Sequence, residues 1–348
     1  FDRVQRPEQV FSALLGAMRV LTDPVETGAV TICLPEDVQA EIIEVPEEFL
    51  ADREWHIRRP RAEASVLAEA ARVIASAQAP LIIAGGGVIY SDAHQALQKF
   101  VEQTKIPVSA SQAGVGSLNW DHPQMCGSVG ATGTTTSNRL AKDADLVIGI
   151  GTRYSDFTTA SRTVFQNPDV KFININVTAF DAFKHGAAIP VVADAREALT
   201  ELSKELNGYA VDAAYAKKIA EEKATWNAIV DASFVDQKLA KPSQSEIIGA
   251  VQAATDPGDV LVGAAGSLPG DLHKLWRVRD PLGYHMEYAF SCMGYEIAGA
   301  IGIKMARPDA DVVCMVGDGS YMMANSELAT AVMMGIPFTV VLTDNRGY

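Results

Sequence analysis

The chain has 348 residues, a length that corresponds to two or three domains. Hydrophobic residues make up 48% and charged residues 21%, as in an ordinary globular protein. The net charge of −14 argues against nucleic acids and anionic membrane surfaces as partners.

Cysteines and apolar runs indicate the compartment. The four cysteines form no CxxC pair, so we expect free thiols in a reducing environment; they are Cys33, Cys126, Cys292 and Cys314. The longest apolar stretch, residues 331–342, is interrupted by Gly335 and Pro337 and is shorter than the ~18 residues of a membrane helix. We therefore expect a cytoplasmic protein. Because the chain begins at Phe1 and ends directly after a predicted strand, we also expect it to be a piece of a longer protein.

The first 207 residues are predicted to form a small N-terminal segment and a larger α/β domain. The N-terminal segment has a helix at 7–18, a strand at 29–34 and a polar stretch at 41–61. Helical patterns follow at 63–77, 94–103 and 196–206, between strand-like runs at 81–84, 106–110, 146–150, 171–177 and 190–192. Such alternation is typical of a doubly wound domain with a parallel sheet, here residues 63–207.

Three features of this middle domain leave alternatives open. Gly85-Gly86-Gly87 follows a strand, but Tyr90 stands where the dinucleotide fingerprint has its third glycine, so a structural role is favoured over a bound nucleotide. The loop 127–136 is rich in Gly and Thr and either lines an active-site cleft or forms a solvated turn. Arg153 either reaches a phosphate or forms a salt bridge between domains.

A helical connector, residues 208–244 with a helix at 213–234, precedes the final domain. That domain begins with a strand at 260–263, after which Gly266, Ser267 and Leu268 open a helix whose N–H groups suit a phosphate.

A turn at 292–295 leads into a helix at 296–305 in the same domain. His273, His285 and Glu287 lie near it in the sequence. Each is either a general acid or base or a hydrogen-bonded structural residue.

Residues 312–347 predict a β-α-β unit with strands at 312–316 and 338–342 and a helix at 325–334. The strands are then parallel, and the polar clusters after them meet at the edge where such sheets bind ligands. Asp318, Asn345 and the main-chain carbonyl of Gly347 supply three oxygens that suit octahedral Mg²⁺. Gly319 and Ser320 open a helix and can direct N–H groups at a phosphate. The unit predicts a site for a metal-bound diphosphate.

This pattern resembles the cofactor motif of thiamine-diphosphate (ThDP) enzymes. Gly317-Asp318-Gly319 is followed by Asn345, 27 residues after Asp318. In that family the Asp, the second residue of an Asn-Asn pair and a carbonyl two residues later bind Mg²⁺. The resemblance thus implies Asp318, Asn345 and Gly347 as metal ligands. Asp344 replaces the first Asn of the pair, but that position precedes the ligand.

The resemblance implies further roles along the chain. The turn at Cys292-Met293-Gly294 is similar to one in which an apolar side chain wedges between the two rings of the cofactor and bends it. The implied cofactor contacts are Gly266, Ser267, Leu268, Met293, Gly317, Asp318, Gly319, Ser320 and Asn345. The carboxylate that activates the cofactor in this family is expected outside this chain.

The implied architecture is that of the acetohydroxyacid synthase-like ThDP enzymes, which assemble as homodimers or homotetramers. The expected domains are a remnant of the pyrimidine-binding domain (1–45), a linker (46–62), the middle domain (63–207), the connector (208–244) and an incomplete diphosphate-binding domain (245–348).

Several strings resemble one branch of the family, the trihydroxycyclohexanedione hydrolases of myo-inositol breakdown. These are residues 151–157, 293–299, 317–323 and 326–328. The branch implies ring opening of a cyclic polyhydroxy dione to 5-deoxyglucuronate. Two alternatives remain: a pyruvate-using carboligase of the synthase type, and a non-catalytic nucleotide-binding protein with its site at Gly85–Gly87.

Overall fold

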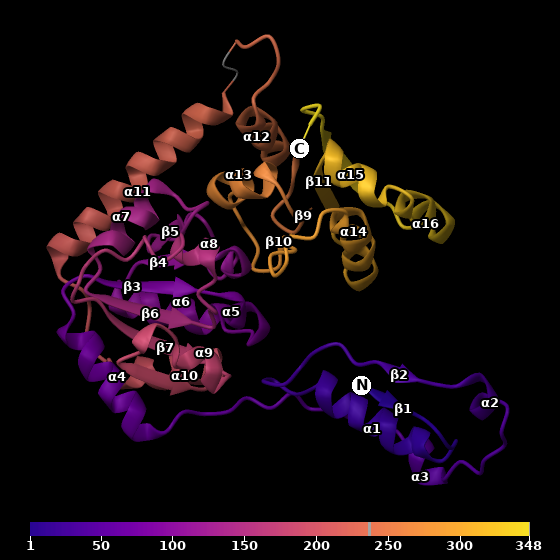
Figure 1. Cartoon of the computed structure of the whole chain (residues 1–348). Helices are drawn as coiled ribbons and strands as arrows, with labels where there is room; N and C mark the ends of the chain where they lie inside the picture. The colour runs from indigo at the N-terminus through magenta and orange to yellow at the C-terminus, as the bar shows by residue number, and fades with distance from the viewer. Residues whose placement is uncertain (236–237, 348) are drawn as a thin grey trace. The chain divides into compact units, whose positions relative to one another are not determined.

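The computed structural model describes residues 1–235 and 238–347 (Figure 1). The chain divides into two compact units, Phe1–Pro60 and a larger unit that begins at Arg61. Among the described residues, no helix combines the length and the apolar character needed to cross a membrane.

The first unit is built around one helix and a two-stranded parallel sheet. Helix α1 (Gln9–Leu21) lies between strands β1 (Asp2–Arg3) and β2 (Ile32–Cys33) in the chain, and the short helices α2 (Glu36–Gln39) and α3 (Glu47–Leu50) follow. The core of this unit consists of Val4, Ala13 and Val38. The predicted helix is confirmed with shifted ends, whereas the predicted strand pairs over only two residues and the predicted polar stretch contains α3.

The middle domain contains a six-stranded sheet in which all neighbouring strands are parallel. Its order is β5 (Met125–Ser128), β4 (Val108–Ala110), β3 (Pro80–Ala84), β6 (Leu146–Ile150), β7 (Lys171–Asn176) and β8 (Ile189–Val192). The first of these strands in the sequence is central, and the chain winds outward from it first to one side and then to the other. This order confirms the doubly wound prediction.

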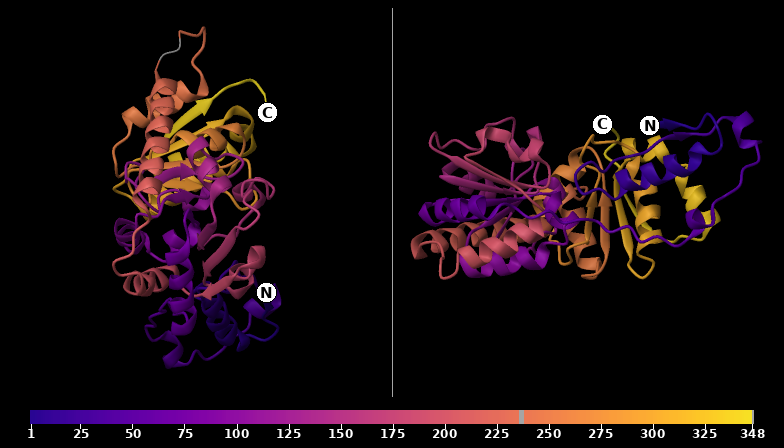
Figure 2. Two further views of the ribbon diagram at one scale, coloured as in Figure 1. Left: turned by 90° about the vertical axis from the view of Figure 1, so that its left-hand side faces the viewer. Right: turned by 90° about the horizontal axis from the view of Figure 1, so that it is seen from below.

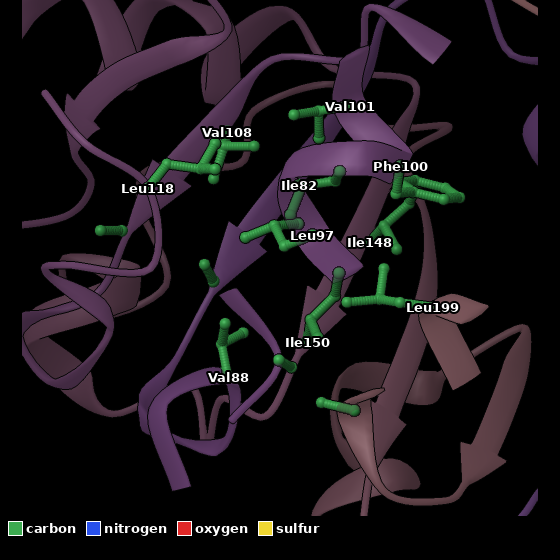
Figure 3. Packing of buried hydrophobic residues seen from close by; sticks show 14 of the residues in the cluster. Ile82, Val88, Leu97, Phe100, Val101, Val108, Leu118, Ile148, Ile150 and Leu199 are labelled. Carbon is green, nitrogen blue, oxygen red and sulfur yellow. The ribbon is translucent and has the colours of Figure 1, made fainter. Parts of the chain in front are cut away.

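Both faces of this sheet are packed. Ile82 and Ile148 face a core that includes Leu97, Phe100 and Leu199, as Figure 3 shows. The intervening residues of β3 belong to a second cluster, because successive side chains of a strand point to opposite faces. The helices of this domain are α4 (Ala64–Ser76), α5 (Gly86–Tyr90), α6 (His94–Thr104), α7 (Thr135–Asp143), α8 (Asp156–Thr159), α9 (Ala179–Ala182) and α10 (Ala195–Glu205).

The connector helix α11 (Ala213–Phe234) has the bounds expected from the sequence. It runs beside α7 (Figure 2), where Thr136 Oγ1 donates a hydrogen bond of 2.8 Å to the main-chain oxygen of Glu222. Arg139 forms an ion pair of 3.1 Å with the Glu222 carboxylate. The connector is therefore attached to the middle domain through Glu222.

The glycines after β3 serve close packing of main chain against main chain. A Cβ atom on Gly85 would lie 2.3 Å from the carbonyl oxygen of Gly151, and one on Gly87 would lie 2.6 Å from the Gly151 Cα. The segment after β3 thus lies directly against the segment after β6, which accounts for these glycines without a nucleotide.

Replacing Gly85 with Ala is expected to destabilise the protein by about 1–3 kcal/mol, because backbone atoms must move to admit the methyl group. Gly302→Ala is the matched control, since that glycine is exposed in a helix with no atom within 4 Å of the added Cβ. The control is expected to be neutral or stabilising by up to about 1 kcal/mol. Urea denaturation of both variants measures the difference, and equal stabilities would contradict the packing argument.

The last domain has a four-stranded, all-parallel sheet. Its order is β10 (Tyr284–Met286), β9 (Val260–Gly263), β11 (Val312–Gly317) and β12 (Thr339–Thr343). Its helices are α12 (Gln244–Ala254), α13 (Ser267–Leu275), α14 (Tyr295–Ala306), α15 (Asp318–Ala324) and α16 (Glu327–Met334). The parallel β-α-β prediction is confirmed, and the helix predicted at 325–334 is present as α16 with a later start. The helix start predicted at Gly319 and Ser320 belongs to a separate helix, α15, which begins at Asp318.

Candidate functional site

The carboxyl ends of β9 and β11 lie side by side where the winding of the last sheet reverses. β10 lies on one side of β9, and β11 and β12 lie on the other. In open parallel sheets such a reversal leaves a crevice at the carboxyl edge, the usual place for a ligand. Gly266, Asp318 and Asn345 follow the ends of β9, β11 and β12 within three residues, so they gather at this one edge.

Gly266 lets the chain turn sharply from β9 into α13. Its φ of +105° belongs to a region that favours glycine, and a Cβ atom there would meet no other atom within 4 Å. The requirement for glycine is therefore conformational, and the space beside it is open. Ser267 opens the nine-residue helix α13, and Leu268 is buried. The first N–H groups of a helix lack partners within it and can receive an anion.

The carboxylate of Asp318 has no partner in the part of the chain that the structure describes. Asp318 is the first residue of α15, after Gly317 at the N-cap, and its side chain forms no hydrogen bond or ion pair with the described residues. In the described part of the chain, no three His, Cys, Asp or Glu side chains gather as a metal site. The expected Mg²⁺ ligands would not form such a group, because they combine one carboxylate with an amide oxygen and a main-chain carbonyl.

The end of β12 forms a tight turn. Gly317 pairs with Thr343 across the sheet, so Asp318 and Asp344 follow at the same level. The side chain of Asp344 accepts a hydrogen bond of 3.0 Å from the Arg346 N–H. Asn345 Oδ1 accepts one of 3.1 Å from the Gly347 N–H, which brings the two predicted ligands together.

Ser320 is buried, and its side chain is bonded within the protein. Its hydroxyl donates to the Glu296 carboxylate, with Oγ 2.7 and 2.8 Å from the two carboxylate oxygens, and accepts a hydrogen bond of 2.8 Å from the Gly294 N–H. Only the main-chain N–H groups of Gly319 and Ser320 remain for a phosphate. Sequence reasoning missed Glu296, because an acidic residue in the first turn of a helix gives no sign of burial.

Met293 lies in a turn that glycine permits. Gly294 has a φ of +90° and is the N-cap of α14. A Cβ atom on Gly294 would lie 3.2 Å from the Cβ atoms of Met323 and Ala324, so this turn packs against α15. Met293 itself is half-buried.

His273 is a structural residue in this protein. Its Nδ1 lies 2.8 Å from Thr132 Oγ1, and its main-chain oxygen accepts a hydrogen bond of 2.6 Å from Ser128 Oγ. Burial lowers the pKa of the imidazole to about 4. The alternative of a general acid or base is therefore not supported for His273. The loop 127–136, which supplies Ser128 and Thr132, holds α13 rather than forming a solvated turn.

His285 and Glu287 have different environments. His285 Nε2 lies 2.6 Å from the Tyr295 hydroxyl, and burial lowers the pKa of its imidazole. It stays a candidate acid or base beside the Met293 turn. The Glu287 carboxylate instead accepts hydrogen bonds of 2.6–3.1 Å from three main-chain N–H groups, those of Ala289, Phe290 and Cys292. Glu287 therefore holds the loop that follows it, which agrees with the predicted alternative of a hydrogen-bonded structural residue.

Arg153 does not form the salt bridge that was one of its two predicted roles, and its contact with a phosphate stays a prediction. Its guanidinium forms no ion pair with the described residues, so the expected interdomain salt bridge is absent from that part of the chain. Its main-chain oxygen accepts a hydrogen bond of 3.0 Å from Lys184 Nζ.

Two family models match the chain. Residues 67–202 match the central domain of thiamine pyrophosphate enzymes, and residues 264–348 match their C-terminal TPP-binding domain. The chain belongs to the thiamine pyrophosphate enzymes. Together the two matches cover more than half of the chain, and the second contains the strand ends described above. The resemblance found in the sequence motifs is thereby confirmed.

Curated relatives narrow the comparison within this family. The chain is 43% identical, over its whole length, to a 3D-(3,5/4)-trihydroxycyclohexane-1,2-dione hydrolase of Bacillus cereus (strain AH820). It is 44% identical to a protein of the same name from Geobacillus thermodenitrificans (strain NG80-2). The chain spans 58% and 57% of the lengths of these relatives.

Proposed function

We propose that this chain belongs to a ThDP- and Mg²⁺-dependent hydrolase that opens the ring of 3D-(3,5/4)-trihydroxycyclohexane-1,2-dione to 5-deoxyglucuronate in inositol breakdown. The observation that carries the proposal is 43% identity to hydrolases of that name along the whole of this chain. The proposal extends to a homodimer or homotetramer in the cytoplasm. The proposal also keeps the domain bounds that were expected from the sequence.

The residues at the carboxyl edge of the last sheet fit the cofactor. Asp318, Asn345 and the Gly347 carbonyl are the proposed Mg²⁺ ligands, and the free carboxylate of Asp318 supports this assignment. A cation is needed there because a protein of net charge −14 must bind an anionic diphosphate. The remaining proposed contacts are Gly266, Ser267, Leu268, Gly317, Gly319 and Ser320 around the diphosphate, and Met293 between the rings.

The cofactor, when bound, supplies a nucleophilic carbon and an electron sink for cleavage of a bond next to a carbonyl. This chain contributes orientation. The main-chain N–H groups after β9 and β11 would hold the diphosphate, and the turn at Met293 would contact the rings of the cofactor. His285, half-buried and hydrogen-bonded to Tyr295, is a side chain near this turn that can move a proton.

The protein at its natural length is expected to consume the dione when ThDP and Mg²⁺ are present and to leave pyruvate unchanged in a parallel reaction. Substrate loss is followed by chromatography, with EDTA-treated protein as the blank. Consumption of pyruvate with the dione untouched would overturn the substrate assignment and favour a carboligase. Binding of ADP or FAD without any effect of ThDP would instead favour a nucleotide-binding protein.

A further inference from the structure

Glu296 is a buried acidic residue in an apolar helix. Only 1% of the residue is exposed to solvent. The carboxylate accepts hydrogen bonds from Ser320 Oγ at 2.7 and 2.8 Å and from the Gly294 N–H at 3.1 Å. No Lys, Arg or His side chain in the described part of the chain forms an ion pair with it. Because burial of an unpaired carboxylate is costly, these hydrogen bonds and the N-terminal end of α14 must offset the loss of water.

The hydrogen-bond donors come from the two segments that are proposed to contact opposite parts of the cofactor. Gly294 follows Met293, the proposed wedge, and Ser320 ends the Gly317–Ser320 segment at the diphosphate. The Gly294 N–H also donates to Ser320 Oγ at 2.8 Å. The carboxylate, the hydroxyl and the N–H group therefore form one closed network between two elements 24 residues apart in the chain.

The chemistry of this network indicates more than packing. A leucine has a similar volume and would bury apolar surface without desolvating a charge, so stability alone does not favour a carboxylate here. A polar network in which each member has a partner instead holds its elements in one arrangement. The N–H groups of Gly319 and Ser320 stay free for the phosphate, since only the serine side chain takes part.

We propose that Glu296 is a positioning residue that holds the Met293 turn and the diphosphate segment in a fixed relation. This inference rests on the proposed function, because the relative position of the two segments matters only to a ligand that contacts both of them. Glu296 does not touch the cofactor itself; it acts through Gly294 and Ser320.

The test uses the protein at its natural length and compares Glu296→Leu, Glu296→Gln and Ser320→Ala. Binding of ThDP in the presence of Mg²⁺ is measured by calorimetry, and folding by the melting temperature. Glu296→Leu is expected to raise the dissociation constant on the order of tenfold. Glu296→Gln, which keeps an acceptor for the Gly294 N–H, restores part of the affinity. Glu327→Leu is the matched control, a first-turn glutamate of α16 without a side-chain bond among the described residues.

Two double-mutant cycles separate positioning from general stability. If Glu296 acts through Ser320 and through the turn that holds Met293, Glu296→Leu adds little to Ser320→Ala in affinity and little to Met293→Ala in kcat. Additive effects in both cycles would overturn the proposal.

Folded Glu296→Leu and Ser320→Ala proteins with the affinity and kcat of the unaltered protein would also overturn it. Where Glu296→Leu fails to fold, Ser320→Ala decides, since it removes one oxygen atom and no main-chain group. Failure of the unaltered protein to bind ThDP would refute the proposed function, and the inference with it.

Discussion

Replacing Asp318 with Ala is expected to abolish Mg²⁺-dependent binding of ThDP. Asp318 supplies the only carboxylate of the proposed ligand set, and its oxygens have no other partner among the described residues. Changes in the groups that merely support metal ligands typically cost 10–100-fold in affinity, so loss of a charged ligand is expected to cost at least about 100-fold. Calorimetric titration with ThDP, in Mg²⁺ and in EDTA, measures the effect.

Asp344→Asn is the matched control for this variant. It lies at the level of Asp318, directly after the neighbouring strand, and among the described residues its side chain bonds only the Arg346 N–H, which an Asn side chain can also do. This variant is expected to keep the affinity of the unaltered protein. Undiminished binding by Asp318→Ala, or an equal loss in both variants, would refute the metal assignment.

The elements that the sequence predicted best are the buried strands and the long connector. Strand β9 and helix α11 have the bounds expected, because a β-branched apolar run and a long helical pattern each give a clear signal. Strands β5 and β10 were not foreseen. The first reads Met-Cys-Gly-Ser and the second has three residues, so neither carries an apolar run of strand length.

The position of the candidate site followed from topology alone. Parallel strands in a β-α-β unit put Asp318 and Asn345 at one edge whatever the details of the side chains, and the register of β11 with β12 agrees. The sequence could not show which side chains were already in use. Ser320 bonds Glu296 across 24 residues of chain, and His273 bonds Thr132 across 141. Such contacts depend on tertiary packing and leave no local pattern.

Acidification is expected to destabilise the protein through His273. Burial places its pKa at about 4 in the folded protein, below the ordinary value of 6.5. Between these values the unfolded chain binds a proton that the folded protein does not, so the free energy of unfolding falls as the pH falls from 6.5 to 4. The 2.5-unit difference between 6.5 and 4 corresponds to a loss of about 3 kcal/mol below pH 4.

Carboxylates titrate in the same pH range as His273. The contribution of His273 is therefore obtained from the difference between the unaltered protein and its variants. Urea denaturation followed by tryptophan fluorescence is measured from pH 7 to pH 4 for the unaltered protein, His273→Gln and Thr132→Val. His273→Gln is expected to reduce the slope of stability against pH, since the variant lacks the titrating group. Thr132→Val removes the 2.8 Å partner of the imidazole but keeps the imidazole, so it lowers stability while the pH dependence stays. If the slope were the same in all three proteins, His273 would not be the group that opposes folding in acid, and its assignment as a buried neutral residue of α13 would fail.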